Sequence, residues 1–194
     1  MTTASITPQE FVDKWQRSKL KERSASQEHF IDLCRMLGHP TPAKADPEGT
    51  TFTFEKGVDK SSGGQGWADV WKKGFFAWEY KGKHKNLNAA YDQLQLYRDA
   101  LLNPPLLIVS DMETIVIYTN FTNTVRQRFT LTFEDLLTQD GLDTLRNAFE
   151  HPDRLRSDQT TGGERLLSRL STTTYRGDTR RWDTWHHGRI SNKR

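Results

Sequence analysis

Gly66-Trp-Ala-Asp-Val-Trp-Lys-Lys-Gly-Phe-Phe-Ala-Trp-Glu-Tyr-Lys-Gly82 is the stretch that decides the fold of this 194-residue chain. Aromatic and β-branched residues fill two arms, Trp67 to Trp71 and Phe75 to Lys81, and Lys72-Lys73-Gly74 lies between them. Such residues favour strands, and glycine adopts the positive φ that a short hairpin turn requires. The pattern therefore predicts a β-hairpin.

The hairpin brings three residues of a possible catalytic site together. Side chains alternate along a strand, so Glu79 and Lys81 project to one face while Trp78 and Tyr80 project to the other. Asp69, on the first arm, can reach the face of Glu79. Two carboxylates suit a hard divalent cation, and the lysine can orient or deprotonate a water or neutralise transition-state charge. An ordinary cross-strand ion pair would give the same spacing. The residues around the hairpin must therefore distinguish a catalytic site from a structural ion pair.

Composition restricts the class of protein. Residues 1–150 contain 18 Lys and Arg against 20 Asp and Glu, whereas residues 151–194 contain 10 against 5, so the excess positive charge lies in the tail. Cys34 is the single cysteine, which excludes a disulfide framework and a cysteine-rich zinc site. No apolar run reaches membrane-spanning length, and the first residues lack the apolar core of a signal peptide. We expect a soluble cytoplasmic protein with no membrane partner.

Two helices are predicted before the hairpin. Thr7-Pro8-Gln9-Glu10 has the pattern of a capping box with proline at the first position. A second apolar periodicity starts after Ser24 and ends at Gly38. Glu22 and Glu28 lie at or near the start of this helix. Either is a solvated acid favoured by the helix dipole, or one of them is a third carboxylate facing the metal.

A helix and two strands are predicted after the hairpin. The apolar period becomes helical from Leu87 to Leu102, and Gln93 and Tyr97 lie one turn apart on this helix, where both can meet the end of the hairpin. Residues 106–109 form a continuous apolar run, typical of a strand buried on both faces, and residues 114–118 form a further strand. Thr132 is expected to cap a last amphipathic stretch.

Two basic regions allow alternative interpretations. Lys83 and Lys85 follow the hairpin and are either solvated or in contact with DNA phosphates beside the presumed active site. Residues 151–194 are rich in basic side chains, and within them residues 172–194 lack apolar periodicity and mix arginines with two tryptophans. We expect a flexible tail or a truncated connector there, although such a mixture can also bind single-stranded nucleic acid.

Residues 51–55 alternate as a further strand between the second helix and the hairpin. The order helix, strand, hairpin, helix, strand, strand, with Asp69 and Glu79-x-Lys81, resembles the PD-(D/E)xK nuclease superfamily. Gln93-x-x-x-Tyr97 resembles the extra motif of its RecB-like branch. A narrower resemblance, over about residues 7–150, is to the N-terminal nuclease domain of MmeI-like (type IIL) restriction–modification enzymes. The segments that carry it are Glu22–Gln27, His29–Cys34, Leu37-Gly38, Gly66–Trp71, Trp78–Lys81, Asn103–Leu107, Ser110-Asp111 and Tyr118–Phe121.

The resemblance implies a restriction-endonuclease-like α/β fold, a central mixed β-sheet flanked by helices. It implies a Mg²⁺-dependent endonuclease acting on double-stranded DNA, with Mn²⁺ as a substitute. Asp69 and Glu79 would be the metal ligands and Lys81 the catalytic lysine. Glu22, or Glu28, would assist the metal, and Gln93 and Tyr97 would be supporting residues.

The chain departs from the family because no methyltransferase or target-recognition domain follows residue 150. Asn103-Pro-Pro-Leu106 is not a methyltransferase motif, since leucine replaces the aromatic residue that stacks on the flipped base. Either a partner supplies recognition, or the chain is a truncated gene product or an excised domain. Two other functions remain open: an inactive interaction module with the nuclease fold, and a RecB-like exonuclease or single-strand nuclease.

Overall fold

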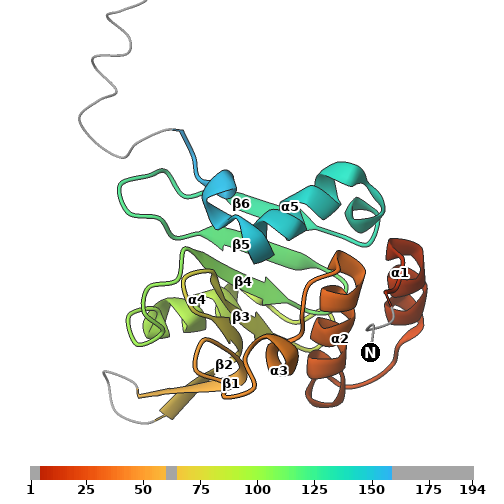
Figure 1. Cartoon of the computed structure of the whole chain (residues 1–194), viewed down its shortest axis with the longest axis horizontal. Helices are drawn as coiled ribbons and strands as arrows, with labels where there is room; N and C mark the ends of the chain where they lie inside the picture. Colours follow the sequence, from red (N-terminus) through yellow and green to blue (C-terminus); the bar gives the residue numbers. More distant parts are fainter. Residues whose placement is uncertain (1–4, 60–64, 159–194) are drawn as a thin grey trace, which may run out of the picture. The chain divides into compact units, whose positions relative to one another are not determined.

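The computed structural model describes residues 5–59 and 65–158. The chain begins with helices, continues with two groups of strands separated by one helix, and ends its described part with helical segments (Figure 1). In chain order they are α1 (Pro8–Arg17), α2 (Glu22–Leu37), α3 (Pro42–Ala45), β1 (Phe52–Asp59), β2 (Gln65–Lys72), β3 (Phe76–Tyr80), α4 (Leu87–Tyr97), β4 (Leu106–Ser110), β5 (Ile115–Thr119), β6 (Arg128–Leu131), the 3-10 turn η1 (Asp135–Leu137), α5 (Gln139–Glu150) and the 3-10 turn η2 (Pro152–Leu155).

The six strands form one mixed sheet in the order β1-β2-β3-β4-β5-β6. All neighbouring strands are antiparallel except β3 and β4, which are parallel and connected through α4. A parallel pair requires such a crossover, because the chain must return to the same end of the sheet. The predicted architecture, a mixed α/β sheet flanked by helices, is confirmed.

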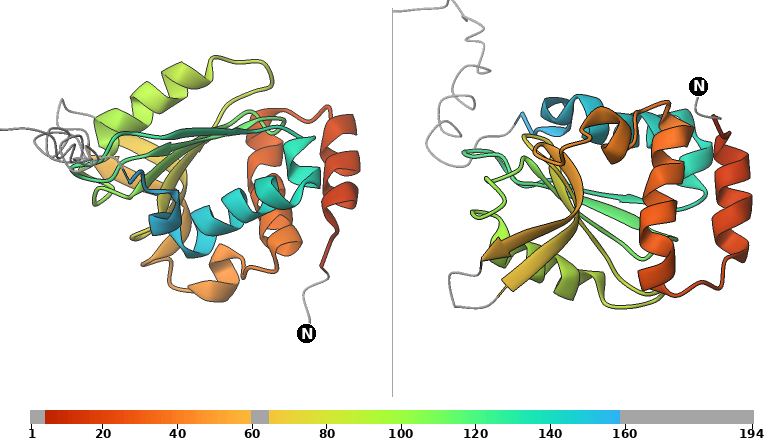
Figure 2. Two further views of the ribbon diagram at one scale, coloured as in Figure 1. Left: turned by 90° about the horizontal axis from the view of Figure 1, so that it is seen from above. Right: turned by 60° about the horizontal axis from the view of Figure 1, so that its bottom comes forward.

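The two faces of the sheet are covered unequally. Helix α4 covers one face, and α1, α2 and α5 cover the other (Figure 2). The larger core, between the sheet and α1, α2 and α5, centres on Phe30, which contacts Phe76, Trp78 and Phe149. The smaller core lies under α4. Strands β3, β4 and β5 are buried along their whole length, as predicted for the run at 106–109.

Several local predictions are confirmed. Lys72 pairs with Phe76 across the predicted turn, and Gly74 has φ 76°. The Thr7–Glu10 capping box forms in full, and Gly38, with φ 69°, ends α2 in the left-handed conformation that glycine adopts without a steric penalty. None of the helices among the described residues is long and apolar enough to cross a membrane.

Other boundaries differ from the prediction. Helix α4 ends at Tyr97, and residues 98–102 form turns, although the apolar period continues to Leu101, whose side chain is buried. Thr138, rather than Thr132, caps α5. Strand β6 was not predicted, because only Leu131 at its end is fully buried and its sequence lacks a clear alternation.

The domain limits at residues 7–150 and 151–194 stay predictions. Within the second range, η2 is ordered and Leu155 is buried in the larger core. The flexible tail was predicted for residues 151–194. Of these, residues 159–194 lie outside the described part of the chain.

Candidate active site

Glu79 is the centre of the candidate site. It lies on the fully buried strand β3, and its side chain projects to the α4 face while Trp78 and Tyr80 join the opposite core. Its Oε1 accepts hydrogen bonds from Lys81 Nζ at 2.7 Å and from Gln93 Nε2 at 2.9 Å. Its Oε2 is buried and has no hydrogen-bond partner among the described residues. Buried polar atoms without a partner are rare in folded proteins, so this oxygen marks a position where a ligand is expected.

Asp69 lies where β2 and β3 separate. The ladder between these strands ends at Val70 and Trp78, so the backbone N–H of Tyr80 has no β2 carbonyl opposite it. Asp69 takes over this donor, since its Oδ2 accepts from Tyr80 N at 2.6 Å. The carboxylate thereby bridges the two arms of the hairpin at their open end. Its partner Tyr80 directly follows Glu79 in the chain.

The charges of the site interact strongly. Burial, followed by the charge of Asp69, raises the pKa of Glu79 to about 7. Burial also raises the pKa of Asp69, and the negative charge of Glu22 adds to this effect. Burial opposes the charge of Lys81, but the hydrogen bond and charge of Glu79, together with Glu22 and Asp69, outweigh it and raise the pKa of Lys81. Lys81 is therefore protonated at neutral pH, which favours a role in neutralising negative charge.

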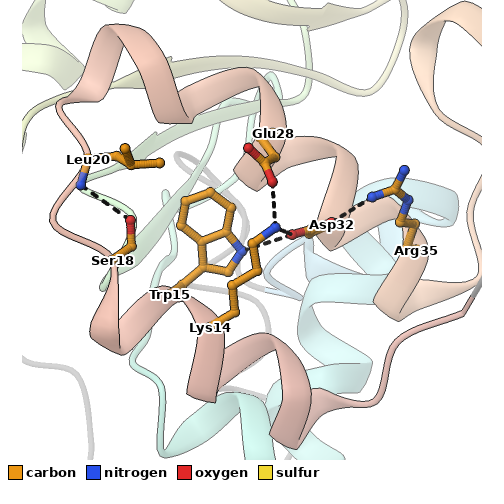
Figure 3. A network of polar contacts seen from close by, with 7 residues as sticks. All are labelled: Lys14, Trp15, Ser18, Leu20, Glu28, Asp32 and Arg35. Atoms are coloured by element: carbon orange, nitrogen blue, oxygen red, sulfur yellow. Dashed lines mark hydrogen bonds and ion pairs between the residues drawn. The ribbon is translucent and has the colours of Figure 1, made fainter.

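The two acids of α2 take different places. Glu22, in the first turn, approaches Gly82, since a Cβ added to that glycine would lie 3.6 Å from Glu22 Oε2. Its charge acts on Asp69, Glu79 and Lys81. Glu28 instead accepts from Lys14 Nζ at 2.6 Å, on the side of α2 that faces α1 (Figure 3). The structure thus brings Glu22 to the site, and Glu28 belongs to the contact between the helices.

The network in Figure 3 holds α1 against α2. Asp32 is buried and accepts from Lys14 Nζ at 2.7 Å, Trp15 Nε1 at 3.2 Å and Arg35 Nη1 at 2.9 Å. A buried carboxylate needs such donors to remain charged. The network therefore stabilises the helix pair from which Glu22 projects.

His29 of α2 anchors the end of β3. Its Nε2 lies 3.2 Å from the carbonyl oxygen of Met112, which can only accept, so Nε2 carries the proton and Nδ1 accepts from the Tyr80 hydroxyl at 2.8 Å. The ring is fully buried, and burial lowers the pKa of His29 to about 3. This neutral histidine fixes Tyr80, the residue between Glu79 and Lys81.

Gln93 and Tyr97, predicted as supporting residues, have different surroundings. Gln93 contacts the site directly through Glu79. The ring of Tyr97 packs on Gly66 of β2, where a Cβ would lie only 2.7 Å from the Tyr97 ring atom Cζ. Glycine is required there for close packing of α4 on β2, so Tyr97 supports the position of the helix that carries Gln93.

The two lysines predicted to contact phosphates also differ. Lys83 Nζ forms an ion pair with Glu113 at 2.7 Å and lies 3.5 Å from the carbonyl oxygen of Trp15. Lys85 is exposed, and no ion pair joins it to an acid of the described residues. The structure thus leaves Lys85 accessible, whereas Lys83 ties the hairpin exit to the β4–β5 connection.

Glu55 is a neighbour of the site that sequence reasoning missed. The pairs on either side, Phe54 with Val70 and Lys56 with Ala68, place it opposite Asp69. It has φ 50°, uncommon for a residue with a side chain. Gln27 Nε2 donates to its Oε1 at 3.3 Å, and both residues line a small cavity with Asp69. A strand pattern contains no signal for a positive φ, so the sequence did not indicate this position.

The chemistry of the donors fits a magnesium ion. Among the described residues, no three His, Cys, Asp or Glu side chains are arranged to enclose a metal. Mg²⁺ does not require an all-protein cage, because it keeps several waters and binds through one or two carboxylates and substrate phosphates. Asp69 and Glu79, whose Oε2 has no partner among the described residues, have the carboxylate chemistry that could hold such an ion.

Comparison with known proteins identifies a family and a similar solved structure. The family model described as MmeI, N-terminal domain, matches residues 4–160. Among solved structures, the chain is similar to one titled "cryoEM structure DrdV-DNA complex", with 19% sequence identity and a TM-score of 0.40. The match covers 75% of this chain and 14% of that chain, so this chain spans about one seventh of the length of its structural relative. The comparison with curated proteins gave no significant match.

Proposed function

Because the chain belongs to the MmeI N-terminal domain family, we propose that it is a metal-dependent endonuclease domain that hydrolyses phosphodiester bonds in double-stranded DNA. The family includes restriction–modification enzymes, as the resemblance of separated motifs already implied. The proposed cofactor is Mg²⁺, for which Mn²⁺ can substitute.

One observation carries the proposal: the environment of Glu79. One of its oxygens is held by Lys81 and Gln93, and the other is buried with no donor from the part of the chain that the structure describes. A carboxylate placed only for stability would have both oxygens satisfied or exposed to water. A carboxylate oriented by two donors and left open on its other oxygen is suited to bind a cation.

The residues have separate roles in this proposal. Asp69 and Glu79 would hold the metal, which when bound polarises the phosphate and acidifies a water. Lys81, protonated because of its acidic neighbours, neutralises charge that develops on the phosphate oxygens. Gln93 orients Glu79, and Glu22 adds negative charge that favours cation binding.

Recognition of a DNA sequence is proposed to come from elsewhere, from methyltransferase and target-recognition domains in a partner or in the parent protein. Among the described residues, the helices and strands are used in building the fold. We therefore expect the isolated chain to cut with little sequence preference and to nick a plasmid before it linearises it, since each domain holds one catalytic centre.

The test is cleavage of supercoiled plasmid DNA in Mg²⁺ or Mn²⁺ by the wild type, Asp69→Ala and Lys81→Ala. We expect nicked and then linear DNA with the wild type and none with either variant. Equal cleavage by all three proteins would show that the site is not responsible. A closed circle left intact beside a digested linear fragment would identify an end-dependent exonuclease instead.

A calorimetric Mn²⁺ titration tests the alternative of an inactive interaction module. The proposed nuclease should bind Mn²⁺ saturably, and Asp69→Ala should abolish that binding. Glu28→Ala is the matched control, because it removes an acid of α2 that lies away from the site. Absence of saturable binding in the wild type would favour the inactive module.

A further inference from the structure

Two exposed arginines lie over a pair of tyrosine rings on the α4 side of the sheet. Tyr91 of α4 and Tyr118 of β5 are stacked, with their ring centroids 3.9 Å apart. The Arg126 Cζ lies 5.5 Å from the Tyr91 ring centroid, and the Arg128 Cζ lies 5.8 Å from that of Tyr118. These four residues are named the Arg–Tyr patch.

The arginines of the patch have no acidic partner among the described residues. Four other arginines pair with an aspartate, namely Arg17, Arg35, Arg98 and Arg146. Neither Arg126 nor Arg128 lies within ion-pair distance of a described carboxylate, and Arg128 uses only its Nε, which donates to the Tyr118 hydroxyl at 3.3 Å. The rings hold the two guanidinium groups through cation–π contacts that leave their remaining N–H donors available.

The chemistry of the patch fits phosphate groups rather than nucleobases. The rings stack on each other, and their hydroxyls are bonded, Tyr118 to Asn88 and Tyr91 to Gln95. They offer little platform for an unpaired base, whereas a guanidinium presents a fork of donors that matches phosphate oxygens. Two such forks without counter-charge suit a polyanion with regularly spaced phosphates.

The patch lies on the same sheet face as the candidate site. Glu79 pairs with Val109, and Val109 with Val116, so Tyr118 is two strands and two residues away from Glu79. Strand spacing and rise per residue place their Cα atoms about 12 Å apart, and Arg128, opposite Tyr118 on β6, about 16 Å from Glu79. A DNA strand carries one phosphate per ~3.4 Å of helix axis, so these separations span roughly three to five phosphates.

We propose that the Arg–Tyr patch binds the phosphodiester backbone of double-stranded DNA a few nucleotides from the bond that is cut. This proposal rests on the proposed function in one respect, the choice of double-stranded DNA as the polyanion that binds. The patch positions the duplex through charge and guanidinium geometry, so its contribution is independent of sequence and sensitive to salt. It supplies local positive charge on a domain whose residues 1–150 have more acidic than basic side chains.

The experiment measures binding of a fluorescent 30-base-pair duplex by anisotropy from 50 to 200 mM salt. The full chain carries Lys81→Ala in Mg²⁺, so that cleavage does not interfere. Adding Arg126→Gln and Arg128→Gln should lower affinity at least tenfold at 50 mM salt. It should also reduce the slope of log K against log salt by about 1.8, or 0.9 for each lost phosphate contact.

The matched control adds Arg17→Gln and Arg146→Gln instead. It removes the same net charge from two arginines that pair with aspartates on α1 and α5, over the opposite sheet face. We expect the affinity of this control to stay within about twofold of the parent, and its slope to stay unchanged. A variant with Arg126→Lys and Arg128→Lys should keep the slope while losing part of the affinity, because charge remains and the fork is lost.

The outcomes separate this proposal from the proposed function. An unchanged slope in the patch variant, an equal loss in the control, or no DNA binding by the parent would each overturn the patch proposal, and the arginines would then only protect the edge strand β6 from pairing. Loss of binding in the patch variant, together with a wild type that does not cleave plasmid, would support the patch and refute the nuclease.

Discussion

Acid should destabilise this protein through His29, which is buried as a neutral ring. Burial lowers the pKa of His29 to about 3, whereas the unfolded chain binds a proton at this residue near pH 6.5. Below pH 6.5 the unfolded state therefore binds one proton more than the native state. The linkage relation then gives a loss of about 1.4 kcal/mol of stability per pH unit, or about 2 kcal/mol between pH 7 and pH 5.

The assay is urea unfolding followed by tryptophan fluorescence at several pH values, in EDTA. The comparison protein is His29→Gln, whose amide can donate and accept but does not titrate. The difference between the two proteins isolates His29, because Glu79, Asp69 and His39 also have shifted pKa values and titrate in both. We expect the wild type to lose about 2 kcal/mol more than the variant between pH 7 and pH 5.

A constant difference between the two proteins over this range would refute the reasoning. Nitrogen-15 NMR of the ring gives a second measurement if the variant fails to fold. It should show the neutral form protonated at Nε2 down to pH 5. Burial keeps the pKa of the ring low, and Nε2 donates its proton to the carbonyl oxygen of Met112. An imidazolium signal from His29 at pH 5 in folded protein would contradict the prediction.

Three further predictions concern packing and backbone support. Gly66→Ala should lower stability by ~1–3 kcal/mol in urea unfolding, because its Cβ would overlap the ring of Tyr97, and adding Tyr97→Leu should recover part of the loss. Phe30→Ala should cost ~3–5 kcal/mol, since this ring is fully buried at the centre of the aromatic cluster, whereas Leu96→Ala, 75% exposed, should change stability by less than about 0.5 kcal/mol. Backbone N–H groups lower the pKa of Asp46 to about 2, so Asp46→Asn should destabilise the protein at neutral pH, with a difference that shrinks as pH falls through 3.8 towards 2; a difference independent of pH would contradict this account.

Local chemistry is what the sequence by itself determined. The contact between Glu79 and Lys81 follows from the two-residue period of a strand, which covalent geometry sets without reference to the rest of the chain. The hairpin turn at Gly74, the capping box at Thr7 and the end of α2 at Gly38 follow equally from single-residue preferences. The family assignment followed from several such motifs in the right order.

Only the tertiary structure chose among the candidate acids and bases. Glu22 and Glu28 are six residues apart, about 240° around a helix, so they face different directions. The rotation of α2 is set by burial of Ala25, Phe30 and Leu33, and that rotation turns Glu22 to the site and Glu28 to Lys14. The apolar pattern shows that one face is buried but does not tell which element covers the neighbouring faces.

The other contacts that the sequence did not predict also join distant segments of the chain. Lys83 pairs with Glu113, Gln93 orients Glu79, and Glu55 meets Asp69 through the register of β1 and β2. The Arg–Tyr patch joins α4, β5 and the start of β6. Each of these contacts links residues at least 10 positions apart along the chain, where local preferences have no influence. Their geometry is decided by the crossover of α4 and the strand order, which form only when burial of the two cores brings the segments together.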